Sequence, residues 1–225
     1  MILNIGIILI LAMFAIAGFK EGIIKTGVSL VGTLLIFIIS FLLKGVIGNL
    51  LCKYLPFFNL EGNYEGLSSI NILIYQLIGF LVIFAILLSI YTVIIKISKI
   101  LDKAIKLTLV FAIPSKILGS ILGIIEGYIV VFVCLVVMMI PLHNTEIFTS
   151  SKIANHIIYK SPILTKLSSP VTKTLEETYQ LGDKIIKKKI SKKEANKKLL
   201  QIMIKNKVVN QKLVDELIES KKLKM

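Results

Sequence analysis

One carboxylate is a candidate for chemistry because it interrupts a long apolar run. From Ile117 to Ile140 the sequence contains a single charged residue, Glu126. Ionisable residues inside membrane-spanning segments are costly, and by default they are candidates for ion binding or proton transfer. Lys25, at the start of an earlier apolar stretch, could reach Glu126 if the two helices adjoin. The open interpretations are a protonatable or ion-binding site, a structural Glu126–Lys25 pair, and a carboxylate near the membrane interface.

No arrangement of residues typical of an enzyme accompanies this carboxylate. The two histidines, His143 and His156, lack the neighbours that a zinc site needs. Gly119-Ser120 lacks the following glycine of a nucleophile elbow. No glycine-rich phosphate-binding loop ending in Gly-Lys-Ser/Thr occurs in the sequence. We therefore expect a protein with no enzymatic activity, no cofactor and no metal.

Small residues recur every four positions around the same carboxylate, at Ser115, Gly119, Gly123 and Gly127. Residues four apart share one face of a helix. Such a face lets the backbone of another helix come close, which is how helices associate in lipid. Two further glycines bracket a tight connection near the N-terminus, Gly18 and Gly22. We predict that these six residues pack helices together.

The elements that must position these residues are apolar segments of membrane-spanning length. We predict four spans, at residues 2–19, 24–43, 70–95 and 117–140. No positive charge precedes the first run, which favours an uncleaved span over a signal peptide. A hydrophobic content of 56% and a mean hydropathy of +0.87 exclude an ordinary soluble domain. The predicted fold class is an all-α, polytopic membrane protein with four transmembrane helices and a basic, helical C-terminal tail.

A basic amphipathic segment, residues 96–106, lies between the third and fourth predicted spans. Its apolar side chains share one face at helical spacing. The other face carries four lysines, Lys96, Lys99, Lys103 and Lys106. We predict a helix in the headgroup region of the anionic leaflet, each lysine contributing about 1 kcal/mol of attraction. A plain solvated connector is the alternative.

The composition changes after Pro141, so we divide the chain into a transmembrane domain, residues 1–141, and a lysine-rich tail, residues 142–225. The tail holds 18 lysines against 8 acidic residues. Apolar stripes predict three helices in it, the first starting at Ser169-Pro170 and the second at the capping box Ser191–Glu194. All 27 basic residues of the chain are lysines. The absence of arginine counts against nucleic acid, and anionic lipid headgroups are the expected partners.

The distribution of lysines near the span ends predicts the orientation of the chain. Seven lysines lie in or beside the first and third connections, and four lie near span ends on the opposite side. Because positively charged connections stay in the cytoplasm, both termini should be extracytoplasmic. The amphipathic segment 96–106 would then lie on the cytoplasmic side.

Three stretches resemble the bacterial colicin V production protein (CvpA) family. They are the connection Gly18–Gly22, the run Leu118–Gly127 and the stretch Ser151–Pro162. The likeness covers roughly residues 1–165. It implies a four-span inner-membrane protein linked to colicin V production or export and to envelope homeostasis. Relatives often carry a basic residue just before the third glycine, where this chain has Glu126, so no family role is carried over to that position.

These observations lead to one main interpretation and two alternatives. The main one is a non-enzymatic inner-membrane protein that supports secretion or envelope integrity by helix-mediated assembly with a second copy or another membrane protein. The first alternative is a small transporter or channel in which Glu126 lines the path. The second is a membrane tether whose basic tail binds anionic lipid or wall polymer.

Overall fold

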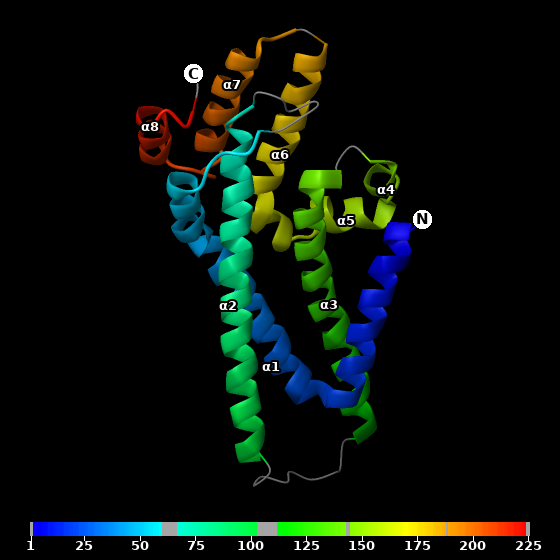
Figure 1. Cartoon of the computed structure of the whole chain (residues 1–225). Coiled ribbons are helices and arrows are strands. Elements are labelled where there is room, and N and C mark those ends of the chain that lie inside the picture. The colour runs from blue at the N-terminus through cyan, green and yellow to red at the C-terminus, as the bar shows by residue number, and fades with distance from the viewer. Residues whose placement is uncertain (1, 60–66, 103–111, 143–144, 188, 224–225) are drawn as a thin grey trace. The chain divides into compact units, whose positions relative to one another are not determined.

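Every regular element that the structure describes is a helix. The computed structural model describes residues 2–59, 67–102, 112–142, 145–187 and 189–223. The elements are α1 (Ile2–Tyr54), α2 (Ile70–Asp102), α3 (Ala112–Leu142), α4 (Glu146–Thr149), α5 (Lys152–Lys160), α6 (Leu164–Ile186), α7 (Lys192–Lys205) and α8 (Gln211–Glu219) (Figure 1). The predicted all-α fold class and the helical tail are confirmed.

Three of these helices, α1, α2 and α3, are long and apolar enough to cross a membrane. The predicted spans 2–19 and 24–43 both lie in α1, which runs for 53 residues. A straight helix of that length would measure about 80 Å, far more than the roughly 30 Å hydrocarbon core of a bilayer. Whether α1 can hold two separate spans therefore depends on a break inside the helix. The number of spans stays a prediction.

That break is at Gly22, whose φ of 78° and ψ of 171° are not helical. It divides α1 into a first arm, residues 2–21, and a second arm, residues 23–54, which meet at a sharp bend in Figure 1. The bend leaves helical donors and acceptors without their usual partners. The Ser115 hydroxyl accepts a hydrogen bond from the Ile23 amide at 3.2 Å, and the Thr26 hydroxyl donates to the Gly18 carbonyl at 3.4 Å. Side chains thus replace part of the lost helical bonding.

The chain forms two compact units, and α1 and α2 each contribute to both. The first unit contains Met1–Ile39 and Phe84–Lys166, and the second contains Ser40–Ile83 and Leu167–Met225. The predicted boundary near residue 141 is a division by composition and stays a prediction.

In the first unit, the short helices after α3 pack near the start of α1. Helix α5 contacts α3 and buries Ala154, Ile157 and Ile158. Its N-cap residue, Ser151, accepts a hydrogen bond from the Ala154 amide, and its hydroxyl also bonds to the Asn4 side chain. The start of α1 therefore lies beside the segment that follows α3.

In the second unit, helices of the tail share an apolar core with parts of α1 and α2. Its most deeply buried side chains include Ile72, Tyr75, Leu199, Met203 and Leu217. Because this core comes from both the tail and the long helices, the tail is part of a folded unit.

Polar contacts join the same elements. The Ser69 amide donates to the Asn196 side-chain oxygen at 3.1 Å. The Lys222 ammonium donates to the carbonyl oxygens of Cys52, Lys53 and Leu55 at the C-terminal end of α1. Such carbonyls have no partners within the helix, so a lysine satisfies them. The Lys53 ammonium also lies 2.5 Å from a Glu216 carboxylate oxygen.

Two details of the predicted elements can be compared with the structure. Helix α6 begins at Leu164 and contains Pro170, so the predicted helix start at Ser169-Pro170 is wrong. Ser191 caps α7 as predicted, because its hydroxyl accepts a hydrogen bond from the Glu194 amide at 3.2 Å.

The predicted surface helix 96–106 is only partly covered by the structure. Helix α2 continues without a break to Asp102. Residues 103–111 lie outside the described part of the chain, and so do the side chains of 96–102. Lys103 and Lys106 therefore lie outside the described residues. Lys96 and Lys99 lie on α2, but their lipid-facing role stays a prediction.

Candidate functional site

The small residues of α3 lie directly against the first arm of α1. A Cβ atom added at Gly119 would lie 2.9 Å from the Cα of Gly22 and would overlap the Gly18 carbonyl oxygen. One added at Gly123 would lie 3.0 Å from the carbonyl carbon of Phe14. These atoms belong to the backbone, so they cannot move aside without shifting the helix. We call this contact the glycine seam.

The remaining small residues extend the seam in both directions. A Cβ atom at Gly22 would lie 3.0 Å from the Ser115 hydroxyl, and one at Gly127 would lie 2.8 Å from the Cβ of Phe14. The structure thus brings together all six residues predicted to pack helices. The small face of α3 is occupied by a segment of the same chain.

Glu126 lies on α3 beside this seam and is bonded to the second arm of α1. Its side chain is buried, with 8% of its surface exposed. One carboxylate oxygen accepts hydrogen bonds from the Ser29 hydroxyl at 2.7 Å and from the Thr33 hydroxyl at 2.9 Å. Ser29 and Thr33 are four residues apart and share one helical face. Hydroxyl donors of this kind stabilise a buried carboxylate, which would be costly alone.

A tyrosine from α2 lies on the same stretch of α1. The Tyr91 hydroxyl donates to the Val28 carbonyl oxygen at 3.2 Å. The Tyr91 ring also lies close to Gly32. A Cβ atom added at Gly32 would be 2.6 Å from the Tyr91 ring carbon that bears the hydroxyl. Polar groups from α1, α2 and α3 therefore gather within this apolar unit, at Ser29, Thr33, Tyr91 and Glu126.

Lys25 does not pair with Glu126 and instead lies 3.9 Å from the carboxylate of Glu21. The suggested structural pair is therefore wrong, and the reason is the register of the helices. Ser115 meets Ile23, and Glu126 is eleven residues further along α3, or about 16 Å at 1.5 Å per residue. Lys25 is only two residues beyond Ile23, so Glu126 lies level with Ser29 and Thr33.

We expect Glu126→Leu to destabilise the protein by about 1–3 kcal/mol, because Ser29 and Thr33 would lose a buried acceptor. Glu126→Gln keeps an acceptor oxygen and should cost less. The measurement is thermal unfolding of the full chain in detergent. Glu21→Leu is the matched control, because its carboxylate is exposed and should change stability by less than about 0.5 kcal/mol. An equal cost for both leucine variants would contradict the assignment.

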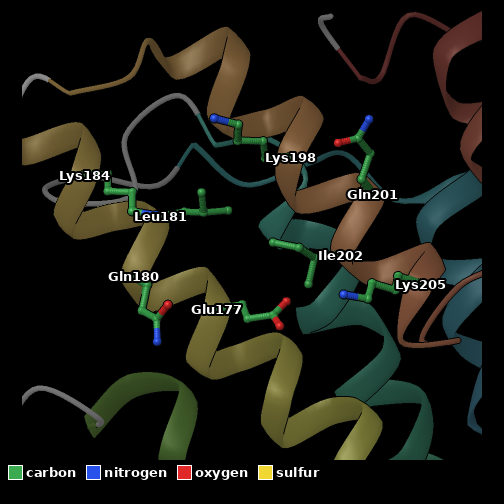
Figure 2. Close-up of a pocket in the computed structure, with 8 residues that line it drawn as sticks. All are labelled: Glu177, Gln180, Leu181, Lys184, Lys198, Gln201, Ile202 and Lys205. Carbon is green, nitrogen blue, oxygen red and sulfur yellow. The ribbon is translucent and has the colours of Figure 1, made fainter.

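The second unit contains an open groove between α6 and α7, with a volume of about 470 Å³. Figure 2 shows Lys184 on α6 and Lys198 and Lys205 on α7 around it. Glu177 also lines the groove, and the Lys198 ammonium lies 2.6 Å from the Glu194 carboxylate. Carboxylates thus offset part of its positive charge.

A second hollow in this unit, as open to the surface as the groove, has a volume of about 420 Å³ and is lined by Lys44 and Lys207. We call it the Lys44–Lys207 cavity. Asn49, Gln76 and Asn210 supply amide groups to its wall. The Gln76 side chain is almost fully buried and donates to the Asn49 oxygen at 2.7 Å. The Gln76 side-chain oxygen has no hydrogen-bond partner, which is costly for a buried group and points to a ligand or water.

The histidines add no metal site to the described part of the chain. His156 is exposed on α5, and His143 lies outside the described residues. Within the described ranges no cluster of three His, Cys, Asp or Glu residues could hold a metal ion.

Sequence reasoning did not find Ser29, Thr33, Tyr91 or Gln76 as site residues. Ser29 and Thr33 could have been found from the sequence. They are hydroxyl residues four positions apart within an apolar stretch, as expected for a polar face within a span. Gln76 is likewise a polar residue within a predicted span, at 70–95. Its partner cannot be deduced from position alone.

The long apolar helices and the backbone-to-backbone seam define the class of this chain as an integral membrane protein of packed helices. A family model described as colicin V production protein matches residues 3–162. The match covers most of the chain and includes the whole glycine seam, so the chain belongs to the colicin V production protein family. The resemblance noted in the sequence is thereby confirmed. Neither a curated protein nor a solved structure matches the chain.

Proposed function

We propose that this protein is a non-enzymatic, multi-pass protein of the bacterial inner membrane that supports colicin-type toxin production or export and envelope homeostasis. Its spans number four in this proposal, and both termini are extracytoplasmic. It acts as a scaffold that assembles with a second copy or with another membrane protein, without binding nucleic acid.

The proposal rests on one observation. The residues matched by the family model are the residues that form the packed, apolar helices. The matched residues, 3–162, cover α1 from its second residue and all of α2, α3, α4 and α5. The residues singled out by their type and spacing serve contacts between helices, as at Gly18, Gly119 and Gly123. A segment whose special residues are used for packing is suited to a structural role in the membrane.

Assembly in this proposal uses surfaces other than the seam. Gly119 and Gly123 already face the first arm of α1, so they are not available to a partner helix. Large apolar side chains on the outer face of α3, such as Ile117, Ile121 and Ile124, are exposed and could contact lipid or another protein. Crosslinking in native membranes followed by mass spectrometry would identify the partner.

The test of this proposal is a gene deletion in the source bacterium equipped with a colicin V secretion system. Deletion should lower the amount of toxin in the medium and raise sensitivity to an envelope-damaging detergent. The full chain should restore both properties. Unchanged toxin release and unchanged detergent sensitivity after deletion would refute the proposal.

A second candidate function, a small transporter or channel, is favoured by the environment of Glu126. A buried carboxylate with hydroxyl neighbours inside an apolar unit is suited to taking up a proton or a cation. Proteoliposomes containing the full chain should then show proton or sodium flux that Glu126→Gln abolishes and Glu21→Gln preserves. Flux that is absent, or equal in both variants, would exclude this function.

A further inference from the structure

The Lys44–Lys207 cavity lies beside the end of an uncharged stretch of α1. Residues 26–43 carry no charge, and Lys44 is the first charged residue after them. Leu42, Val46 and Leu50 repeat every four residues on the same helix and are exposed at 71%, 64% and 53%. An exposed apolar stripe on a membrane protein is suited to contact with acyl chains. Leu42 also lines the cavity, so the stripe and the cavity adjoin.

The charge of the cavity favours an anion. Lys44 and Lys207 supply two ammonium groups, and none of the lining residues that the structure describes is acidic. The Lys44 ammonium donates to the Phe41 carbonyl oxygen at 3.3 Å, and an ammonium has three N–H groups, so further donors remain. Lys207 has a φ of 56°, the left-handed conformation that commonly ends a helix, and Lys221 adopts the same conformation after α8.

Gln76 adds a second requirement on the ligand. Its side chain is 3% exposed and lies against Gly48, where a Cβ atom would be 2.9 Å from both its amide carbon and its oxygen. The amide nitrogen is used by Asn49, while the oxygen is buried and unpartnered, in a residue that lines the cavity. A carbonyl oxygen accepts hydrogen bonds and cannot donate them. The ligand that fits should therefore carry a hydroxyl donor as well as a negative charge.

We propose that the Lys44–Lys207 cavity binds the headgroup of an anionic phospholipid that combines a phosphodiester with free hydroxyl groups, phosphatidylglycerol being the simplest. The two ammonium groups bind the phosphate, the Gln76 oxygen accepts a headgroup hydroxyl, and an acyl chain follows the Leu42–Val46–Leu50 stripe. The proposal rests on the chain being a membrane protein and is independent of the role in toxin production. A soluble glycerol phosphate shares the headgroup chemistry, and the experiment separates the two sources.

The groove between α6 and α7 fits this ligand less well. It has three lysines, but Glu177 lines it and Glu194 pairs with Lys198. It therefore serves as the comparison site. Lys205 lines the groove and Lys207 lines the cavity, only two residues further along the chain. Loss of one charge at either position changes the net charge of the protein equally.

The experiment is native mass spectrometry of the full-length protein released from a neutral detergent and titrated with defined lipids. Phosphatidylglycerol should bind the wild type and Lys205→Gln equally. It should bind Lys207→Gln and Lys44→Gln about tenfold more weakly, because each loses a charge-assisted hydrogen bond. Phosphatidylmethanol, a phosphodiester of the same charge without a headgroup hydroxyl, and phosphatidylcholine, which is neutral overall, should both bind the wild type more weakly.

Three results would overturn the proposal. Equal losses in Lys205→Gln and Lys207→Gln would show that only the overall charge matters. Equal binding of phosphatidylmethanol and phosphatidylglycerol would remove the role of Gln76. Glycerol phosphate displacing the lipid at equal concentration would assign the cavity to a soluble ligand.

A variant at Gln76 tests whether this side chain lies beside the bound phosphate. Gln76→Glu preserves the shape of the side chain and adds a negative charge beside the phosphate. If its melting temperature matches the wild type, phosphatidylglycerol binding should fall at least as much as in Lys207→Gln. Unchanged binding in this folded variant would refute the site.

Discussion

Gly123→Leu should remove most of the folded protein from the membrane. The new side chain would have to enter a contact in which even a Cβ atom lies 3.0 Å from the Phe14 carbonyl carbon and overlaps the carbonyl oxygen. Overpacking a well-packed site usually costs about 1–3 kcal/mol, and here the obstacle is backbone, which cannot rotate away. We therefore expect a loss of more than about 3 kcal/mol, a large share of the stability of a typical domain.

Two matched substitutions separate this steric effect from a general effect of leucine. Gly6→Leu makes the same chemical change on the first arm of α1, where nothing lies within 4 Å of an added Cβ atom. Ile124→Leu changes the exposed neighbour of Gly123. Both should accumulate as the wild type does. Protein abundance in membranes and unfolding temperature in detergent are the measurements, and equal tolerance of all three variants would show that the seam does not hold the helices together.

The seam illustrates what residue spacing can and cannot reveal. A four-residue repeat identifies the face of α3 that meets another helix, because the helical period is a local property. It does not identify the covering segment, since any helix backbone can approach a face of small residues. The structure shows that the first arm of α1 covers it, through Phe14 and Gly18. The resemblance of Gly18–Gly22 to the family pointed to the same region.

The site around Glu126 likewise combines a residue that the sequence reveals with contacts that it does not reveal. Glu126 could be found because a charge within an apolar run is conspicuous in sequence. Its partners could not, because Ser29 and Thr33 are more than ninety residues away and their position depends on helix register. Lys25 was the natural candidate by charge, but it lies too near the bend. Register is set by the seam and by the bend, which only the fold reveals.

Three of the tail's helices, α6, α7 and α8, were predictable, but α4, α5 and the contacts of the tail were not. Its apolar stripes contain the side chains that are buried in α7 and α8, including Leu199, Met203 and Leu217. The start of α6 was misplaced because Ser169-Pro170 is a strong local signal that the helix overrides. The hydrogen bonds of Asn196 to Ser69 and of Lys222 to the end of α1 join residues 127 to 170 positions apart. Local patterns carry no information about such pairs.

Gly22→Ala should destabilise the protein, because the bend at Gly22 sets the register of both arms of α1. Its φ of 78° and ψ of 171° lie in a region that is essentially restricted to glycine. An alanine there should cost about 1–3 kcal/mol from backbone strain alone, and its Cβ atom would lie 3.0 Å from the Ser115 hydroxyl that holds the Ile23 amide. Straightening the bend instead would break the seam.

Gly27→Ala is the matched control, because it makes the same change five residues further along the same helix. The nearest atom to its new Cβ would be a Leu122 methyl carbon at 3.7 Å, an ordinary van der Waals distance. Alanine is favoured over glycine inside a helix, so this variant should be as stable as the wild type or up to about 1 kcal/mol more stable. Unfolding in detergent should therefore move in opposite directions for the two variants. If Gly22→Ala were as stable as Gly27→Ala, the chain would not need the glycine-only conformation, and the register that places Glu126 beside Ser29 and Thr33 would have another origin.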